Sequence, residues 1–456
     1  MKKRIYSILE VKSREFDSRV FLSLVAANMN YSAIFCKKEY INNYANYMRP
    51  GVILVKSIGQ LNIKLINKLI KAGHKICSLD EEGLLFFNSE IYCRKRINKD
   101  ILKLVDYIFC WGKNDYDAII KHHPEYSKKI KITGSPRIDL LKKNNQLIYK
   151  KNFEQLERVY GEYILINTNF GYANHLRHPN YSIVDKMIEN GVNDINEIQL
   201  HKNKLEVQKI RFKKIINVLD NLSNNLTKMN IIIRPHQSES DLTWKKIISK
   251  YKNVKLIRDG VASIPWMLGA RVIISFNCTT GLEGKILGLN PLNFLAVRNS
   301  ISDYKLPNLI NQNFYDEDEL LNKVYSSLKE TPKNNVSELH SEVKDYLFNL
   351  DQNKQFESIH NILEYLNELD FSKNQNFKDE YTNFINFSYF KFKRYIKNLI
   401  NKNKFKTSTY SMLLKQKNKG TTLCEVQERS NEFSENLKLE SINVKEIYPD
   451  VYCFEK

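Results

Sequence analysis

Short β-branched segments alternate with stretches of helical spacing along most of the chain, and this alternation constrains the fold more than any other feature. The segments predicted as strands are 4–10, 32–35, 51–55, 74–79, 107–112 and 129–132, and then 163–170, 231–233, 254–257, 272–274 and 291–295. Helical spacing fills the intervals, for example over 61–72 and 207–226. A strand–helix–strand series builds a parallel sheet with helices on both faces, so we predict an α/β protein.

The series falls into two parts, divided by a polar stretch at 142–157. A chain of 456 residues is long enough for two domains and an appendage. We therefore predict two Rossmann-type parallel-sheet domains that face one another, with a C-terminal helical and basic extension. The predicted boundaries are 1–155, 156–335, 336–370 for helices that pack back across the domains, and 371–456 for a tail.

A long polar insertion, 172–204, interrupts the second part of the chain. Structureless loops of this length are uncommon inside compact domains. The insertion is therefore predicted to be a lid, or a helical excursion over the cleft between the domains.

The composition, 42% hydrophobic and 27% charged, is typical of a globular protein. No run approaches the roughly 20 apolar residues needed to cross a bilayer, and the basic start lacks the apolar region of a signal peptide. The seven cysteines have no metal-ligand spacing. We expect a cytoplasmic protein with reduced cysteines, no disulfide framework and no metal.

The formal net charge of +20 favours anionic partners such as nucleotides, phospholipids or acidic glycans. Nucleic acid is not expected, since no helix-turn-helix, zinc-finger or RNA-binding aromatic signature is found. Residues 371–420 carry 12 Lys and Arg against 2 Asp and Glu, with aromatic residues interleaved over 384–396. That pattern predicts either an interfacial helix on an anionic membrane surface or a docked helix with a solvated basic face. The last 36 residues are acidic, with 8 Asp and Glu against 4 Lys and Arg, and are expected to be loosely ordered.

Polar residues at the end of the predicted strand 231–233 indicate a phosphate site. Arg234, Pro235 and His236 follow the strand directly. Ligands of open parallel sheets collect at the carboxyl ends of strands, where a charged residue and a histidine are natural beside a ligand. His236 is predicted to donate a hydrogen bond to phosphate or to protonate a leaving group. The alternative is a histidine satisfied within a loop network.

The strand 272–274 ends in hydroxyl residues and a predicted helix start. Thr280 and Glu283 have the spacing of a capping box, in which each side chain bonds the other's backbone. A helix start also presents unpaired N–H groups that favour phosphate. In that interpretation Ser275, Thr279 and Thr280 add donors, and Glu283 accepts from ribose hydroxyls.

Three adjacent carboxylates, Asp80, Glu81 and Glu82, end the predicted strand 74–79 and precede Gly83. Repulsion between like charges can raise the pKa of one carboxyl group and prepare it to act as a base. The alternative is a solvated acidic turn that caps the next helix. Two further polar strand ends, 133–137 and 167–169, complete the pattern.

In this order, the strand ends resemble those of bacterial surface carbohydrate biosynthesis proteins, a group of two-domain transferases related in design to polysialyltransferases and to transferases of Kdo or pseudaminic-type sugars. The resemblance covers residues 5–345 and depends on Arg14, Glu15, Asp80–Gly83, Gly134–Arg137 (with Ser135 and Arg137), Asn167–Phe170 (with Asn169), Arg234–His236, Glu239, Trp244, Thr279, Thr280 and Glu283.

The resemblance implies a GT-B-like fold, a CMP-activated acidic sugar as donor, and no metal or other cofactor. Carried over, Glu81 and Glu82 fall on the acid pair that supplies the catalytic base, with Glu81 as the choice, and His236 on the phosphate-binding histidine. Thr279 and Thr280 fall on the hydroxyl pair. One departure is that Gln237 follows His236 where the family pattern has proline.

The residues of this resemblance also divide by their expected ligand. Asp80, Glu81, Glu82 and His236 are assigned to catalysis; Arg234, His236, Ser275, Thr279, Thr280, Glu283 and Asn169 to the donor; and Arg14, Glu15, Ser135 and Arg137 to the acceptor side. With inversion a carboxylate deprotonates the acceptor, whereas with retention Asp80 or Glu81 acts as nucleophile.

The expected partners are a CMP-sugar donor and a glycan or glycolipid acceptor, at the inner face of the cytoplasmic membrane. Two alternatives stay open. One is a CDP-glycerol or CDP-ribitol polyol-phosphate transferase, and the other is a non-catalytic nucleotide- or membrane-binding protein whose basic tail is the active part.

Overall fold

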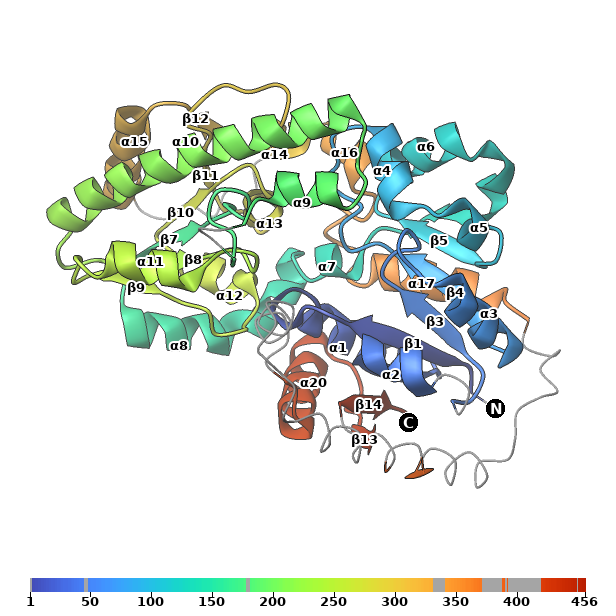
Figure 1. The fold of residues 1–456 in the computed structure, drawn as a ribbon. Helices are drawn as coiled ribbons and strands as arrows, with labels where there is room; N and C mark the ends of the chain where they lie inside the picture. The colour runs from blue at the N-terminus through green and yellow to red at the C-terminus, as the bar shows by residue number, and fades with distance from the viewer. Residues whose placement is uncertain are drawn as a thin grey trace. The chain divides into compact units, whose positions relative to one another are not determined.

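The protein divides into two compact units, and each is considered by itself. A computed structural model describes residues 2–44, 48–177, 181–330, 341–370, 388, 389, 392, 420–448 and 450–456. Unit 1 comprises Met1–Leu140 with Lys344–Lys456, and unit 2 comprises Leu141–Val343. Unit 1 is therefore built from both ends of the chain, whereas unit 2 is continuous (Figure 1).

The strands of unit 1 form one eight-stranded sheet in the order β13-β14-β2-β1-β3-β4-β5-β6. The strands are β1 (Arg4–Leu9), β2 (Ser32–Lys37), β3 (Val52–Val55), β4 (Lys75–Leu79), β5 (Tyr107–Cys110), β6 (Ile130–Ile132), β13 (Lys445–Tyr448) and β14 (Val451–Phe454). The first six are parallel, while β14 is antiparallel to β2 and β13 is antiparallel to β14. The central strands are almost entirely buried, as expected when helices cover both faces.

Helices cover both faces of this sheet. They are α1 (Lys12–Asn28), α2 (Lys38–Tyr44), α3 (Ile63–Lys71), α4 (Ser89–Arg96), α5 (Lys99–Leu102), α6 (Lys113–His122), α7 (Pro136–Asp139), α17 (Glu357–Asn367) and α20 (Leu423–Leu437), with a 3-10 turn η2 (Pro124–Lys129). Side chains of α3 to α6 join one core cluster with the strands. Helix α1 packs on β1 and β2 and contacts α7, α17 and α20.

The C-terminal segment from residue 420 is part of the unit 1 fold, so the expectation of a loosely ordered acidic end is wrong. Strand β14 pairs with β2 from Val451 opposite Cys36 to Phe454 opposite Ala33. On α20, Phe433 packs edge-on against Phe21 of α1, 5.9 Å between ring centroids. The acidic residues lie mainly outside these apolar contacts, so net charge alone was a poor guide to order.

Unit 2 contains a six-stranded sheet in the order β12-β11-β10-β7-β8-β9, and its pairs are all parallel. The strands are β7 (Tyr163–Asn167), β8 (Asn230–Arg234), β9 (Val254–Leu256), β10 (Val272–Ser275), β11 (Leu292–Phe294) and β12 (Gln312–Phe314). The chain moves outward from β7 to β9 and then returns to β10 on the other side. The topological switch point therefore lies between β7 and β10, where ligands of such sheets bind.

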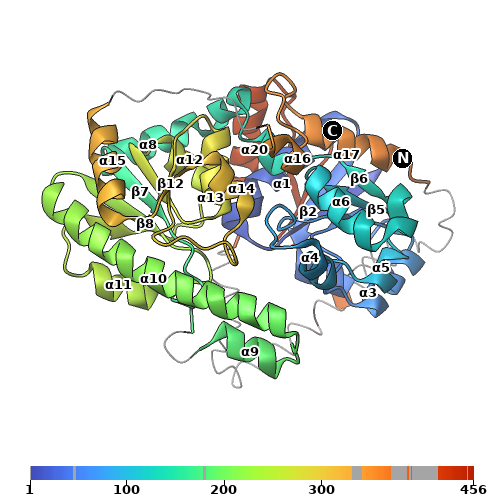
Figure 2. The same cartoon turned by 90° about the horizontal axis from the view of Figure 1, so that it is seen from above.

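The helices of unit 2 are α8 (Lys150–Tyr160), α9 (Ile183–Glu189), α10 (Ile195–Asn225), α11 (Asp241–Ile248), α12 (Ser263–Leu268), α13 (Thr279–Ile286), α14 (Lys305–Ile310) and α15 (Glu317–Lys329), after a 3-10 segment η3 (Lys143–Tyr149). Helix α16 (Val343–Tyr346) stands at the boundary between the units. Helices α10, α11 and α15 share one core cluster with the strands, while α8, α12, α13 and α14 pack together on the other face (Figure 2).

The predicted fold class is confirmed: the chain is α/β and contains two Rossmann-type parallel sheets, which are the components of a GT-B-like fold. The insertion 172–204 contains α9 and the start of α10, as the helical alternative predicts. The polar stretch 142–157 that divides the two parts of the chain is occupied by η3 and most of α8. The boundaries at 155 and 335 stay predictions.

The basic and aromatic segment 371–420, predicted to be either an interfacial helix on a membrane or a helix docked on the protein, falls almost wholly outside the described residues. Among the helices that the structure does describe, none combines the length and the apolar character needed to span a bilayer.

Candidate functional site

In unit 1, Glu15 anchors the turn between β1 and α1. Its carboxylate accepts hydrogen bonds from the backbone N–H groups of Glu10 (2.8 Å) and Val11 (3.1 Å). It also pairs with Arg14 (2.9 Å) and with Lys56 (3.0 Å), which directly follows β3. Burial alone would raise the pKa of Glu15, but the charges of Arg14, Lys56 and Arg19 outweigh it and lower the pKa to about 2. Glu15 is therefore a structural anion at this strand end.

Two carboxylates of the acid turn are held by cations. Arg96, at the end of α4, binds Asp80 through two nitrogens, with Nε to Oδ2 at 2.8 Å, and reaches Glu82 at 3.2 Å. Arg14 binds the other oxygen of Glu82 at 3.2 Å. Burial raises the pKa of Asp80 despite Arg96. Burial also opposes ionisation of Glu82, but Arg14, Lys56 and Arg96 together lower its pKa. Asp80 is therefore the carboxyl group of these two with a raised pKa, and the chief cause is burial rather than repulsion between neighbouring carboxylates.

Glu81 is turned into the unit, unlike its neighbour. Its side chain is 1% exposed, compared with 50% for Glu82. Oε1 pairs with Arg19 of α1 at 2.7 Å, and the same arginine donates to the carbonyl of Ile8 at 3.0 Å. Among the residues the structure describes, neither Glu81 Oε2 nor Arg19 Nη1 has a hydrogen-bond partner. Arg137 Nη1 lies 3.7 Å from Oε2, so two guanidinium groups flank the carboxylate.

The strand end after β6 holds Arg137 in place. Its guanidinium lies over the ring of Trp111, 5.6 Å from the centroid, and the indole donates to the carbonyl of Asp80 at 2.5 Å. Ser135 caps α7 by accepting from the N–H of Arg137, and its backbone is bound by the side chain of Asn349. Ser135 is fully buried and holds the backbone of Arg137, and its predicted place on the acceptor side stays a prediction.

The acid turn and the strand ends around it therefore form one cluster in unit 1. The structure brings together the predicted residues Arg14, Glu15, Asp80, Glu81, Glu82 and Arg137, and it adds Arg19, Lys56 and Arg96, which the sequence reasoning missed. Two of these had a signal in the sequence. Arg19 stands four residues after Glu15, on the same helix face, and Lys56 ends a predicted strand. No comparable pattern marked Arg96.

In unit 2, a buried carboxylate organises two strand ends. Glu239 Oε1 accepts hydrogen bonds from the hydroxyl of Thr168 (2.7 Å) and the N–H groups of Phe170 and His236 (both 3.0 Å). Oε2 accepts from the indole of Trp244 at 2.8 Å. Burial raises the pKa of Glu239, although these four donors favour the ionised form. Glu239 thus ties the loop after β7 to the loop after β8.

His236 is oriented by the loop that follows it. Its Nδ1 lies 2.7 Å from the hydroxyl of Ser238 and accepts from the N–H of Ser238 at 3.3 Å. These two contacts hold the imidazole ring against the backbone and side chain of Ser238. The loop after β7 approaches closely at Gly171, where an added Cβ would lie 2.1 Å from the Ser238 hydroxyl. A side chain at position 171 would therefore displace the Ser238 hydroxyl, which contacts His236.

Arg234 binds the loop between β9 and α12. Its guanidinium pairs with Asp259 at 3.0 Å, donates to the carbonyls of Val261 (2.7 Å) and Ala262 (3.3 Å), and lies over Trp266, 5.2 Å from the ring centroid. These contacts give Arg234 a structural role here. Its predicted contact with phosphate stays a prediction.

The strand end after β10 differs from the predicted capping box. Helix α13 begins at Thr279, its N-cap is Cys278, and no side chain caps it. Thr280 lies within the first turn, 2.9 Å from the Cys278 sulfur, and Glu283 accepts from Ser263 at 3.4 Å. The capping-box prediction is therefore wrong, because the helix starts one residue before Thr280.

Ser275, predicted to donate to a ligand, is fully buried at the end of β10. Its hydroxyl has no hydrogen-bond partner in the described part of the chain and lies against Gly281 of α13. Thr279 and Thr280 are half-buried at the surface of this strand end. Of the three hydroxyls, only the two threonines are accessible.

Asn169 stands at the switch point itself. It lines a small cavity of about 10 Å³ with the loop after β10 and with α10, the other lining residues being Phe170, Lys204, Val207, Gln208, Arg211, Phe276, Asn277, Ser302 and Tyr304. Such a space holds about one water molecule. Within the described residues, no cluster of His, Cys, Asp and Glu is arranged to bind a metal ion.

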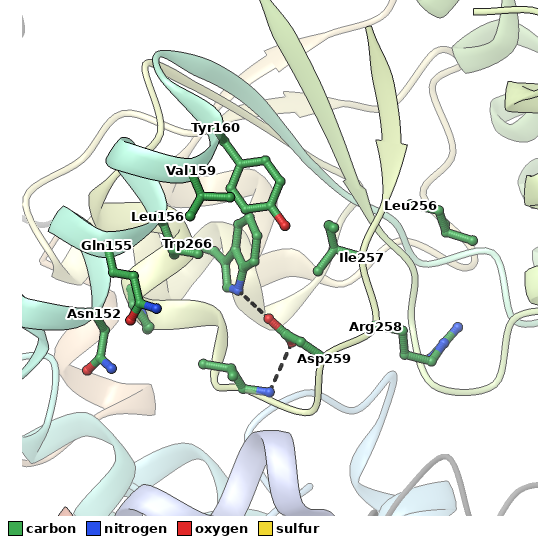
Figure 3. A pocket seen from close by; sticks show the side chains of 12 residues that line it. Asn152, Gln155, Leu156, Val159, Tyr160, Leu256, Ile257, Arg258, Asp259 and Trp266 are labelled. Atoms are coloured by element: carbon green, nitrogen blue, oxygen red, sulfur yellow. Dashed lines mark hydrogen bonds between the residues drawn. The ribbon is translucent and has the colours of Figure 1, made fainter. Parts of the chain in front are cut away.

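A larger cavity, of about 470 Å³, lies between α8 and the loop after β9 (Figure 3). It is lined by α8, by the loop after β9 and by the start of α12, through Asn152, Gln155, Leu156, Val159, Tyr160, Leu256, Ile257, Arg258, Asp259, Val261, Pro265 and Trp266. This volume is in the range of small-molecule sites. The sequence analysis did not predict a site here, because the stretch 142–157 was described only as a polar boundary between the two parts of the chain.

The chain belongs to the α/β class with a GT-B-like fold, because it contains two Rossmann-type units with polar strand ends. No family model and no curated protein sequence matches it. It is similar to the solved structure of UDP-GlcNAc 2-epimerase from Neisseria meningitidis bound to UDP-GlcNAc, at 12% identity and a TM-score of 0.47, with 81% of this chain and 100% of that chain covered.

Two further solved structures are similar at the same level. UDP-N-acetylglucosamine 2-epimerase from Rickettsia bellii has 13% identity and a TM-score of 0.48, covering 80% of this chain and 96% of that chain. The wall teichoic acid polymerase TagF, as its H548A variant, has 12% identity and a TM-score of 0.42, covering 86% and 90%. Likeness at this level does not transfer a function, so the proposal below rests on the residues of this chain.

Proposed function

We propose that the chain is a glycosyltransferase that moves a CMP-activated acidic sugar onto a bacterial surface glycan. The sugar is a nonulosonic acid, such as pseudaminic, legionaminic or sialic acid, or Kdo. The observation that carries the proposal is His236, held at the carboxyl end of β8 by Ser238 and, through its backbone N–H, by Glu239. β8 is next to the switch-point strand β7, so a nucleotide phosphate bound there lies within reach of this histidine.

Unit 2 is proposed to bind the donor. Transfer breaks the bond between the anomeric carbon of the sugar and a phosphate oxygen, and CMP leaves with the electron pair. His236 Nε2–H stabilises the charge that develops on that phosphate, and Thr279, Thr280 and the free N–H groups at the start of α13 add donors. Arg234 acts indirectly by fixing the loop through Asp259.

Unit 1 is proposed to supply the base that removes the proton of the acceptor hydroxyl. The sequence favours Glu81, but its side chain is 1% exposed and bound to Arg19. Glu82 is half-exposed, so it is the carboxylate that an acceptor can reach. Glu81 then positions Arg19 and Arg137, while Asp80 holds Arg96.

The proposed location is the cytoplasm, peripherally at the inner face of the membrane, through the basic segment 371–420. The proposed acceptor is a glycan or a glycolipid. A net charge of +20 favours contact with both acidic glycans and anionic lipids.

The test of the function is transfer from a panel of CMP-activated nonulosonic acids and Kdo to a glycan acceptor, with the linkage read by NMR. Glu82→Gln is expected to lower transfer by about 10²- to 10⁴-fold, the range of a lost general base, with CMP affinity unchanged. Glu81→Gln is the matched variant. If only Glu81→Gln loses transfer activity, Glu81 is the base. Activity with CDP-glycerol instead of CMP-sugars would favour the polyol-phosphate alternative.

A further inference from the structure

Helix α3 of unit 1 lies in a stretch of the chain that has no acidic residue. Residues 40–79 contain six Lys and Arg and no Asp or Glu. Asp and Glu together make up 51 of the 456 residues of the chain, so about four would be expected over this length. Helix α3, near the centre of the stretch, therefore has no acidic side chain on any face.

The solvent face of α3 carries three lysines and two isoleucines. Lys64, Lys68 and Lys71 are exposed, and none of their ammonium groups has an ion-pair or hydrogen-bond partner in the described part of the chain. They follow one another at spacings of four and three residues, so they form one row along the helix. Ile63 and Ile70 are 42% and 38% exposed, and they stand two turns apart on a line beside this row.

The rest of α3 is fixed in the fold, so this face is turned to the outside of unit 1. Ile66 and Leu69, on the opposite side of the helix, are fully buried in the core of the unit. Asn62 caps the helix by accepting a hydrogen bond from the N–H of Lys64 at 2.8 Å. Figure 1 shows α3 at the outer edge of the ribbon of unit 1.

The elements next to α3 do not balance its charge. It contacts β4, which contains no acidic residue, and α5, whose single acid is Asp100. Asp100 pairs with Lys103 at 2.9 Å, and Asp106, which follows α5, pairs with Lys75 at 3.4 Å. Each acid near the helix is thus bound to another lysine, and the positive charge of α3 faces solvent.

We propose that this face of α3 docks on an anionic lipid bilayer. Lysines beside exposed aliphatic side chains suit an interfacial helix, because the ammonium groups reach the headgroups while the aliphatic groups enter the acyl boundary. A nucleic acid or an acidic glycan accounts for the lysines but gives the two exposed isoleucines nothing to contact. The inference goes beyond the proposed function, since it assigns a membrane contact to the folded part of unit 1, separate from the segment 371–420, and needs no sugar donor.

The test is co-sedimentation of the full chain with phosphatidylcholine vesicles that contain or lack phosphatidylglycerol. The wild-type chain is expected to bind the anionic vesicles and to bind the neutral ones far more weakly. Lys64→Gln/Lys68→Gln/Lys71→Gln is expected to weaken anionic binding about 100-fold, since one lysine near such a surface strengthens binding about fivefold. The three corresponding Lys→Arg changes keep the charge and are expected to keep the binding.

The matched control removes three lysines from unit 2. Lys228, Lys245 and Lys246 are exposed, and Lys228→Gln/Lys245→Gln/Lys246→Gln changes the net charge by the same amount. This variant is expected to bind anionic vesicles within about twofold of the wild-type chain, because the proposed contact is confined to α3. An equal loss in the two triple variants would show a general effect of charge and would overturn the docking face.

Ile63→Ser/Ile70→Ser separates a lipid surface from other polyanions. It is expected to weaken binding to anionic vesicles about tenfold, through the lost apolar contact, and to leave binding to heparin unchanged. Ile63→Ser, at the more exposed of the two positions, serves alone if the double variant is unstable in thermal unfolding.

Three further outcomes overturn the inference: no binding of the wild-type chain to anionic vesicles, unchanged binding in the lysine variant of α3, or unchanged vesicle binding in the isoleucine variants. CMP binding is expected to be unaffected by all of these changes. Failure of the docking face therefore leaves the proposed function standing, and failure of the CMP titration leaves the docking face standing.

Discussion

The two units stabilise their strand ends in opposite ways. In unit 1 the acids Glu15, Asp80, Glu81 and Glu82 are paired with arginines and a lysine. In unit 2 one acid, Glu239, is surrounded by neutral donors. The first arrangement locks charges against each other, whereas the second shapes two loops and holds His236 in one orientation. The contrast is between an acid cluster held by ion pairs in unit 1 and two loops held by hydrogen bonds to a single carboxylate in unit 2.

The two units also differ in that unit 1 contains a segment from the far end of the chain. Removal of that segment is expected to cause the largest loss of stability. Truncation after residue 419 removes β14 and α20, and with them the buried side chains of Val426, Phe433, Val451, Tyr452 and Phe454. At about 1.5–3 kcal/mol each, the loss is roughly 10 kcal/mol, which approaches the whole stability of a domain. We expect the thermal transition of unit 1 to disappear and that of unit 2 to remain.

Calorimetry of the truncated chain measures this directly. Removal of residues 455 and 456 alone is the control and is expected to leave both transitions in place. A truncated chain that keeps both transitions would show that the C-terminal segment is dispensable for the fold.

The next largest loss of stability is expected for Glu239→Ala, which removes the carboxylate that holds the two loops of unit 2. It leaves four donors without their acceptor, including the N–H of His236 and the indole of Trp244. The expected cost is about 4 kcal/mol in urea unfolding, since a buried unsatisfied group costs about 1–3 kcal/mol. Glu239→Gln keeps one acceptor oxygen and is expected to cost less. Equal stability of the two variants would contradict the role given to this carboxylate.

In unit 1 the corresponding change is Arg19→Met, which leaves Glu81 buried with only Arg137 nearby, at 3.7 Å. Breaking a buried pair costs about 3–5 kcal/mol, and Arg137 offsets part of it. The double variant Arg19→Met/Glu81→Met removes both charges and is expected to recover most of the loss in urea unfolding. A double variant no more stable than Arg19→Met would argue against charge pairing as the source of order here.

The smallest effect is a pH dependence of opposite sign at two carboxyl groups, Glu15 in unit 1 and Glu239 in unit 2. The pKa of Glu15 is lowered from 4.5 to about 2, so its contribution is complete above pH 4.5 and is lost as the pH falls toward 2. The pKa of Glu239 is raised above 4.5, so unit 2 loses stability as the pH rises through that value. Each group contributes a slope of at most about 1.4 kcal/mol per pH unit.

Unfolding curves of the two units between pH 2 and 7 give both slopes. Glu15→Gln is expected to flatten the slope of unit 1, and Glu239→Gln that of unit 2. Slopes of the same sign in both units, unchanged by these variants, would contradict the assignment.

The α/β class was predictable because the strands are short β-branched segments separated by stretches of helical spacing. The segments of β8 and β10 are examples. The cations that pair with the acid turn were not predictable from the sequence. Arg96, for example, reaches Asp80 only after α4 folds. β14 was missed because its strand pairs with β2 at the other end of the chain, a contact that no local pattern encodes. The capping box failed because the N-cap of helix α13 is Cys278, two residues before Thr280, and the start of a helix cannot be located to within two residues from the sequence.

Titration calorimetry with CMP tests the central claim, that unit 2 binds a nucleotide through His236. The wild-type chain is expected to bind CMP, His236→Ala to bind it about tenfold more weakly, the effect of roughly one lost hydrogen bond, and Glu82→Gln to bind it unchanged. The same titration with CDP-glycerol and with UDP-sugars measures the specificity for the nucleotide. An unchanged dissociation constant in His236→Ala, or no heat at millimolar CMP, would contradict the account.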